Sequence, residues 1–308
     1  MKNIILVLLV NILAIVNSSA SDQNLNTNNI KKSGPQNILF IGNSYLYYND
    51  SLHNHFKRIV EERFPDYDGG NSVKSSTIGG SRLKHHNLEH LLGAKSISSV
   101  DKFDLVILQG GSGESLSKND REEFFKVVKK HINKIKSIGA DAALYMIHAY
   151  VKPHKNYSPT LIRVIEKMYT KAGKDNNALV IPVGLAFENA YNQRPTIKLH
   201  KIDGTHPDIL GTYLAACVVY ASIHKDNPIG ISYDYNGVIN SEDKLFLQKI
   251  AHETVQKYFI TLCFISLLRI RVYDAAQGAE FKKGSYMIFT PSASADNANF
   301  YITHIINT

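Results

Sequence analysis

Two short segments of this sequence carry side chains that could together hydrolyse an ester. Ser44 follows an apolar run and the turn formed by Gly42 and Asn43. Asp203 lies three residues before His206, in a polar segment near the other end of the chain. A serine hydroxyl is a weak nucleophile unless a base removes its proton. An imidazole that is oriented by a carboxylate is such a base, so these segments predict a nucleophile and its activating pair.

Neither segment is specific when it is taken alone. An Asp three residues before a His is common where a helix begins, because the carboxylate caps the first turn. Pro207 suits that reading, since proline is favoured in the first turn of a helix. A serine after a strand is a weaker signal still. The two segments therefore gain weight only if the fold brings them together.

The rest of the pattern indicates how the fold could do so. Short apolar runs alternate with longer amphipathic ones. The predicted strands cover 37–41, 71–78, 104–109, 142–148 and 178–182. The predicted helices cover 51–64, 83–92, 118–138, 158–172, 209–223 and 243–257. Strands separated by helices predict an α/β fold, with a parallel sheet between two layers of helices. Ligands bind at the carboxyl ends of such strands, so residues just after Ile41, Ile78 and Leu108 are the first candidates for a site.

Taken in order, the candidate segments resemble the blocks of the SGNH (GDSL-like) hydrolase superfamily. The resemblance is strongest to the branch with G-N-S in place of G-D-S at the nucleophile, and it runs from about Ile38 to Lys257. The segments that carry it are I-L-F-I-G-N-S-Y, G-G-S-R-L-K-H-H, V-I-L-Q, V-I-P-V-G-L-A-F and D-G-T-H-P-D-I-L-G-T-Y-L-A-A-C.

The resemblance implies a flavodoxin-like, three-layer α/β/α sandwich with about five parallel strands. It makes Ser44 the nucleophile, His206 the base and Asp203 the residue that orients the base. The oxyanion hole would then include the backbone N–H groups of Ser44 and Gly80. It implies no metal and no organic cofactor.

Two positions depart from the family pattern. Asn43 replaces the usual Asp before the serine, which we expect to be a mild change because that Asp is not the triad acid. The asparagine of the third block is missing. Gln109 could donate its amide N–H to the oxyanion instead, with Ser112 as the second candidate. The alternative is that Gln109 only satisfies backbone groups of its loop.

A further set of residues is expected to contact the substrate: Asn43, Tyr45, Gly79, Ser112, His86 and His148. Tyr45, Tyr47 and Tyr48 follow the nucleophile and could stack on a sugar, but packing at the helix entry explains them at least as well. His86 and His90 lie four residues apart on a predicted helix, but no third ligand pattern accompanies them, so we expect no metal site there.

The two ends of the chain differ from its centre. A positive start, the apolar run Ile4–Val16 and small residues up to Ala20 predict a signal peptide over 1–20, and therefore a secreted or periplasmic protein. The polar segment 21–36 predicts a flexible leader. We expect the hydrolase domain to cover 37–257, followed by a C-terminal extension over 258–308, either an extra hairpin or poorly ordered.

The net charge bears on which binding partners to expect, and the cysteine content bears on whether a disulfide forms. The formal net charge is +8, yet the lysines are spread along the chain, with their highest density on the helix predicted over 118–138. We read that density as a solvated helix face and expect no nucleic-acid partner and no stable membrane insertion after signal removal. Cys217 lies in an apolar run and predicts a buried thiol; whether it pairs with Cys263 stays open.

These expectations favour an exported serine esterase that removes short acyl groups, such as acetyl, from carbohydrate. The substrate class comes from the resemblance. A lipid or lysophospholipid esterase is the second possibility. A secreted, non-catalytic carbohydrate-binding protein on a hydrolase fold is the third, and the missing third-block asparagine favours it slightly.

Overall fold

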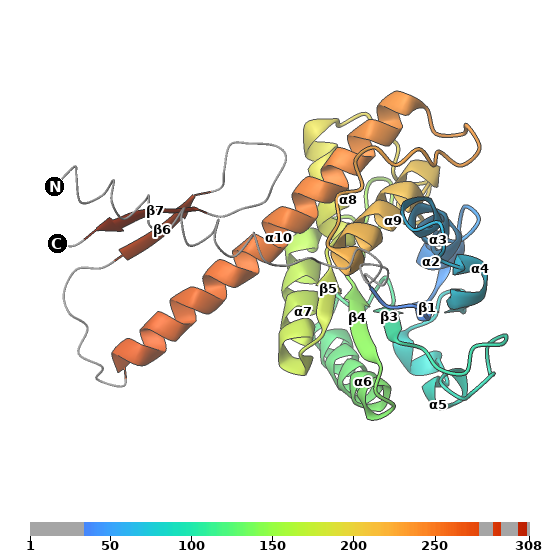
Figure 1. The fold of residues 1–308 in the computed structure, drawn as a ribbon, viewed down its shortest axis with the longest axis horizontal. Coiled ribbons are helices and arrows are strands. Elements are labelled where there is room, and N and C mark those ends of the chain that lie inside the picture. Colours follow the sequence, from blue (N-terminus) through green and yellow to red (C-terminus); the bar gives the residue numbers. More distant parts are fainter. Residues whose placement is uncertain (1–33, 277–285, 291–300, 307–308) are drawn as a thin grey trace, which may run out of the picture. The chain divides into compact units, whose positions relative to one another are not determined.

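A computed structural model describes residues 34–276, 286–290 and 301–306 of the chain. Its main element is a parallel sheet with the strand order β2-β1-β3-β4-β5 (Figure 1). The strands are β1 (Ile38–Gly42), β2 (Val73–Thr77), β3 (Leu105–Gln109), β4 (Asp141–Tyr145) and β5 (Leu179–Ile181). The predicted parallel sheet and its flavodoxin-like order are confirmed.

Helices cover both faces of this sheet (Figure 1). The helix α6 packs against α7 and both contact β4, whereas α3 packs against α9. The helices are α2 (Ser44–Tyr47), α3 (Leu52–Arg63), α4 (Gly69–Ser72), α5 (Leu88–Leu91), α6 (Lys118–Ser137), α7 (Leu161–Asn176), α8 (Val183–Gln193), α9 (Ile209–His224) and α10 (Ser241–Ala276), with a 3-10 turn η2 (Leu83–His85). This is the three-layer α/β/α arrangement that the sequence predicts.

The apolar runs form the strands because the sheet buries them on both faces. Every residue of β1 and of β3 is buried, while β2, at the edge of the sheet, is buried only at Val73. β1 pairs with β2 on one side and with β3 on the other, so the strand order reverses there. The loops after β1 and β3 leave in opposite directions at such a point and open a crevice at the carboxyl ends.

The helix α9 is buried all round. Residues 211–222 are all buried in it, and the helix has no solvated stripe. A helix of this kind belongs to the core. It carries Cys217, which is 0% exposed and free, so the expected buried thiol is confirmed.

Two of the longer helices differ from the prediction. No helix is predicted between 183 and 208, yet α8 occupies Val183–Gln193. The last predicted helix, over 243–257, continues to Ala276 in α10. Beyond it, β6 (Tyr286–Thr290) and β7 (Tyr301–Ile306) pair as an antiparallel hairpin, one of the two forms expected for the C-terminal extension. Residues from Val255 onward form a second compact unit.

The predicted signal peptide and most of the predicted leader lie outside the described residues. In the part of the chain that is described, no helix is both long and apolar enough to cross a bilayer. The domain boundaries therefore stay a prediction.

Candidate active site

Ser44 sits where β1 passes into α2. Asn43 caps this short helix, since its side-chain oxygen accepts a hydrogen bond from the Tyr45 N–H at 3.1 Å. Ser44 is the first residue of the helix and is 8% exposed. Among the described residues, no group accepts a hydrogen bond from its backbone N–H. The first N–H groups of a helix have no intrahelical acceptor, so this donor is free for a bound group.

Asp203 and His206 lie on a narrow loop that enters α9. The loop is closed by backbone hydrogen bonds from Lys201 N–H to His206 O and from Asp208 N–H to Leu199 O, both 2.8 Å long. Gly204 turns the chain at a φ of 70°, a left-handed conformation that favours glycine. A Cβ atom there would lie 2.3 Å from the carbonyl oxygen of Val151. The loop therefore depends on this glycine.

The fold brings the two candidate segments together. The His206 Nε2 atom lies 2.9 Å from the Ser44 Oγ atom. The His206 Nδ1 atom lies 2.6 Å from the Asp203 Oδ2 atom. A carboxylate can only accept, so Nδ1 carries the proton and Nε2 is left to accept the serine hydroxyl. Ser44, His206 and Asp203 thus form a continuous hydrogen-bonded chain.

Asp203 also holds its own loop. Its Oδ1 atom accepts the backbone N–H groups of Thr205 at 2.9 Å and of His206 at 3.0 Å. Burial acts to raise the pKa of Asp203, but the hydrogen bonds from His206 and Thr205 outweigh it and lower the pKa to about 2. The carboxylate is therefore ionised throughout the neutral range, as an orienting acid must be.

A buried aromatic group supports the loop beside His206. The Tyr45 hydroxyl shares a 2.7 Å hydrogen bond with the Thr205 hydroxyl. His148 stacks on the Tyr45 ring at 4.2 Å and donates from Nε2 to the Thr205 carbonyl oxygen at 2.8 Å. Burial, then the neighbouring His200, hold the pKa of His148 well below its usual range, so this imidazole is neutral. Tyr45 and His148 were expected to contact substrate, but they are 2% and 1% exposed and hold Thr205 instead.

Asn43 and Gln109 are also turned into the protein. The Asn43 amide donates to Ser81 O at 3.0 Å, and its backbone N–H donates to Gln109 Oε1 at 2.8 Å. The Gln109 amide nitrogen donates to Gly110 O. This geometry favours the alternative, that Gln109 satisfies backbone groups of its loop, over the expected donation to an oxyanion. Asn43 links the loops after β1, β2 and β3 rather than facing a substrate.

Other predicted positions remain open to a bound molecule. Gly79 and Gly80 are exposed after β2, and Gly80 has a φ of 66°. Its N–H donates to no other described residue. Ser112 is partly exposed beside the hydroxyls of Tyr45 and Tyr150. Ser112 is therefore better placed than Gln109 to supply the third polar group.

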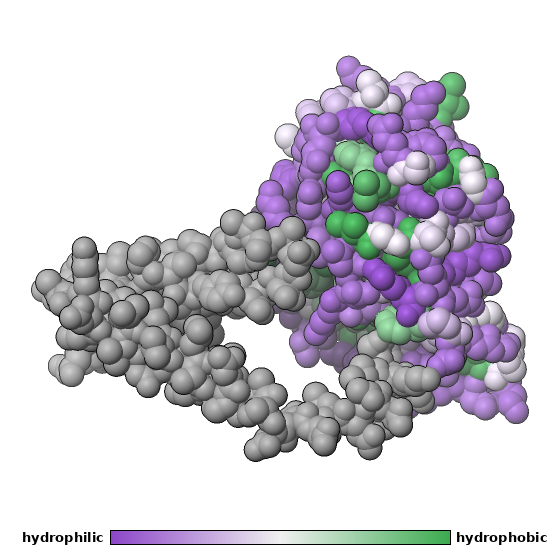
Figure 2. Space-filling view, turned by 45° about the horizontal axis from the view of Figure 1, so that its top comes forward, coloured by the Kyte–Doolittle hydropathy of each residue, from purple (hydrophilic) through white to green (hydrophobic). Residues whose placement is uncertain are grey.

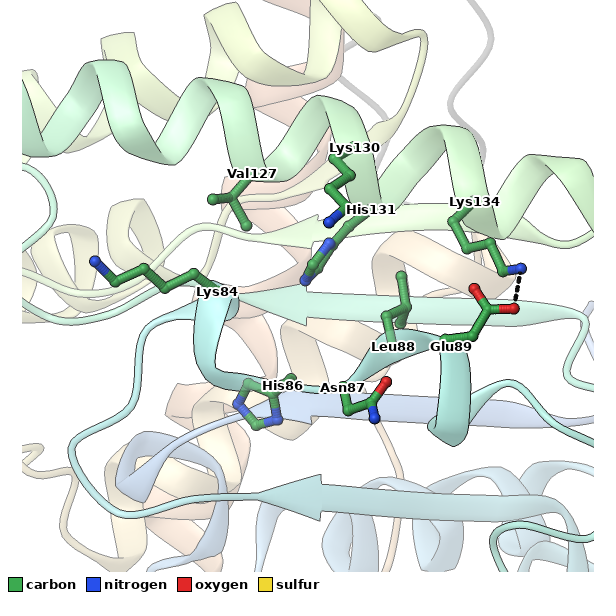
Figure 3. Close-up of a pocket in the computed structure, with 9 residues that line it drawn as sticks. All are labelled: Lys84, His86, Asn87, Leu88, Glu89, Val127, Lys130, His131 and Lys134. Atoms are coloured by element: carbon green, nitrogen blue, oxygen red, sulfur yellow. Dashed lines mark hydrogen bonds and ion pairs between the residues drawn. The ribbon is translucent and has the colours of Figure 1, made fainter.

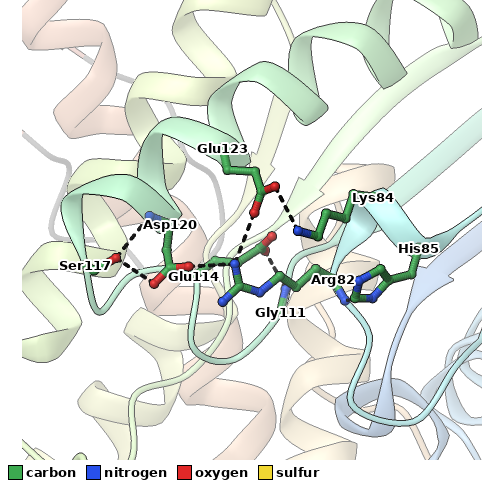
Figure 4. Close-up of polar contacts among 8 residues, drawn as sticks. All are labelled: Arg82, Lys84, His85, Gly111, Glu114, Ser117, Asp120 and Glu123. Carbon is green, nitrogen blue, oxygen red and sulfur yellow. Dashed lines mark hydrogen bonds and ion pairs between the residues drawn. The ribbon is translucent and has the colours of Figure 1, made fainter.

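An ion-pair cluster joins the loop after β2 to the residues that follow β3 (Figure 4). The Arg82 guanidinium contacts Asp120 at 2.6 Å and Glu123 at 3.2 Å, both on α6. Nearby, the Glu114 carboxylate accepts the Gly111 N–H at 2.6 Å. Glu114 is 2% exposed, and burial raises its pKa to about 7.

His86 faces a different part of the molecule. It lines a pocket between α5 and α6 with His131 and three lysines, Lys84, Lys130 and Lys134 (Figure 3). Its Nε2 atom lies 3.0 Å from the Ser81 hydroxyl. None of the triad residues lines this pocket. The expectation that His86 contacts the substrate is thus unsupported, and its contact with Ser81 gives it a place behind the Gly79–Ser81 loop.

Among the described residues, no three His, Cys, Asp or Glu side chains are grouped to hold a metal ion. Tyr48, one of the three tyrosines after the nucleophile, packs its ring on His206 at 4.4 Å. Asn49 is a site residue that the sequence did not predict, since it donates to Pro207 O at 2.9 Å.

No family model and no curated protein matches the chain. Solved structures do match. A DUF4886 family protein from Bacteroides uniformis is 18% identical over 71% of this chain and 94% of its own, with a TM-score of 0.55. A protein from Slackia heliotrinireducens assigned to the SGNH hydrolases is 22% identical over 61% and 98%, with a TM-score of 0.48. An acetylxylan esterase from Geobacillus stearothermophilus is 14% identical over 62% and 95%, with a TM-score of 0.46.

Many further matches are SGNH or GDSL-like hydrolases, among them lipases and acylhydrolases. At these identities the likeness concerns the fold. The three-layer architecture that the sequence motifs predict is confirmed by the sheet of this chain and by its likeness to the DUF4886 family protein, with a TM-score of 0.55.

Proposed function

We propose that this chain is a serine esterase of the SGNH type that hydrolyses short acyl esters, with Ser44 as nucleophile. The observation that supports it is the pair of contacts at His206, 2.9 Å to Ser44 Oγ and 2.6 Å to Asp203 Oδ2. Residues 162 positions apart make the first contact. A fold has no structural need for a serine, a histidine and an aspartate in this order at a strand end, whereas acyl transfer does.

The reaction follows from these contacts. His206 Nε2 takes the Ser44 proton as the hydroxyl attacks the ester carbonyl, and Asp203 stabilises the imidazolium that forms. The free N–H groups of Ser44 and Gly80 would receive the developing oxyanion, and each such donor is worth roughly 2.7–4 kcal/mol in acyl transfer. His206 then protonates the departing alcohol, and water repeats the sequence to release the acid from Ser44.

The substrate we propose is an acetyl group on a carbohydrate, and export through a cleaved signal peptide is part of the same proposal. The second candidate, a lipid esterase, would need a long apolar cleft. The pocket between α5 and α6 contains none of Ser44, Asp203 and His206, so it does not bear on the acyl chain that the site accepts.

The test is hydrolysis of p-nitrophenyl acetate and p-nitrophenyl palmitate, together with labelling by a fluorophosphonate probe. We expect turnover of the acetate, and a labelled peptide that contains Ser44. Ser44→Ala should lose labelling and turnover, and His206→Ala should lose turnover while the fold is kept. A folded Ser44→Ala variant that still hydrolyses the acetate would overturn the assignment. Glycan binding without turnover of either ester would favour the non-catalytic reading.

A further inference from the structure

The three tyrosines that follow the nucleophile point to different places. Tyr45 is buried and holds Thr205. Tyr47 is 41% exposed, and its ring stacks on the ring of Tyr48 with centroids 5.4 Å apart and planes 14° apart. Tyr48 in turn packs on the His206 imidazole at 4.4 Å. An exposed aromatic ring, backed by a second ring, thus stands beside the catalytic base.

The pair spans one side of the site. At one end it meets His206, and the Lys201 ammonium lies 5.5 Å from the Tyr48 ring. At the other end the Tyr47 hydroxyl lies 3.3 Å from the position a Cβ on Gly79 would take, next to the Gly80 N–H. A group bound over the free face of the Tyr47 ring would therefore lie beside the Gly79–Gly80 loop, with the Tyr48 ring between it and His206.

We propose that Tyr47, backed by Tyr48, is a platform on which a sugar ring of the substrate's alcohol part stacks. This inference rests on the proposed function and names the substrate class of the same site. A sugar ring has an apolar face of C–H groups and a polar rim. The exposed Tyr47 ring matches it, because a flat apolar face carries a phenol hydroxyl at its edge.

The surroundings favour a sugar over an alkyl chain. An alkyl chain gains binding energy from enclosure by aliphatic side chains, because the gain scales with the apolar area removed from water. Here the aliphatic residues of the two flanking loops are exposed to solvent and form no enclosure: Ile78 is 46% and Ile202 is 94% exposed. On the surface in Figure 2, hydrophobic residues lie in small groups among hydrophilic ones. A single open ring face can cover a sugar but cannot surround an acyl tail.

The test compares two acetates that differ in the ring, xylose tetraacetate and ethyl acetate. We expect Tyr47→Ala to lower the ratio of kcat/KM for the sugar acetate to kcat/KM for ethyl acetate by about 2- to 10-fold, as the loss of one stacking contact predicts. The loss should appear in KM, because Tyr47 touches no reacting atom. Tyr47→Phe should keep the ratio. The matched control is Tyr157→Ala, which removes an equally exposed tyrosine (40%) that lies against Lys152.

A second measurement separates this inference from the proposed function. Calorimetric binding of xylose tetraacetate to Ser44→Ala, with and without Tyr47→Ala, needs no turnover. Binding that weakens with Tyr47→Ala supports the platform even if neither acetate is hydrolysed, in which case only the esterase proposal fails. Hydrolysis that requires Ser44 but shows an unchanged ratio in Tyr47→Ala would overturn the platform alone. An equal fall in Tyr157→Ala would also overturn it.

Discussion

The hydrogen bond between the Tyr45 and Thr205 hydroxyls offers a sharp test of how the site is held. It is 2.7 Å long, Tyr45 is 2% exposed, and it joins the neighbour of Ser44 to the neighbour of His206. Removing one partner of a buried hydrogen bond costs about 1–3 kcal/mol. Thr205 is only partly buried, so we expect Tyr45→Phe to lower the free energy of unfolding by about 1 kcal/mol, near the lower end of that range.

The same loss should reach catalysis. If the whole of that energy serves to place His206, kcat/KM for p-nitrophenyl acetate falls by up to about fivefold, since a factor of ten needs 1.36 kcal/mol. Thr205→Val should have a similar effect, and the double variant should be little worse than either, with a coupling energy of about 1 kcal/mol.

Unfolding in urea and kcat/KM across pH would be measured for all three variants. The control is Tyr213→Phe, which removes a buried hydroxyl that donates to Tyr233 O at 3.1 Å, away from the triad. It should cost stability and leave kcat/KM unchanged. Strictly additive effects of Tyr45→Phe and Thr205→Val would refute the reasoning, because they would mean that the two hydroxyls act independently.

Three other variants test further contacts. Gly204→Ala should lower the free energy of unfolding by more than the roughly 1–2 kcal/mol that a left-handed conformation costs an L-residue, because its Cβ atom also meets the Val151 carbonyl oxygen. A urea unfolding curve identical to that of the wild type would contradict this. Gln109→Ala should lower the free energy of unfolding by about 1–3 kcal/mol, because it leaves the buried Asn43 N–H without an acceptor. A loss of kcat of about 100-fold or more at unchanged stability would instead restore Gln109 as an oxyanion donor. Burial raises the pKa of Glu114 from 4.5 to about 7, so the folded state binds the extra proton. Its stabilising contribution is present below pH 4.5 and is lost as the pH rises through 7. Glu114→Gln should reduce the decrease in the free energy of unfolding between pH 4 and pH 8, measured by urea unfolding at each pH. A decrease identical to that of the wild type would exclude Glu114 as its cause.

The parts of the site that the sequence predicts are those set by local order. Ser44 follows a strand and a turn, and Asp203 precedes His206 by three residues on one loop, so both segments are visible without tertiary information. Parallel strands then bring their carboxyl ends to one edge. That edge accounts for Ser44 but not for His206, because α8 lies between β5 and the loop that carries His206. The meeting of the two residues was implied by the family resemblance.

Side-chain direction is what local order leaves undetermined. Gln109 is the last residue of β3, at the same edge of the sheet as Ser44, yet contacts with Asn43 and Gly110 turn its amide inward. His148 lies beside Thr205 because the segment after β4 meets the loop before α9, where the Val151 N–H donates to Gly204 O at 2.9 Å. No spacing in the sequence predicts that contact. The helix α8 is a different case, since Val183, Ala186 and Phe187 have helical spacing that could have been read.

Because α9 is buried, alkylation of the Cys217 thiol can be used to measure global unfolding of the domain. Burial raises the pKa of its thiol to about 12, and alkylating reagents attack the thiolate of an accessible sulfur. Iodoacetamide should therefore reach this sulfur only when the helix leaves the core. The rate at which the peptide containing Cys217 becomes alkylated would follow rare unfolding under native conditions, without any engineered label.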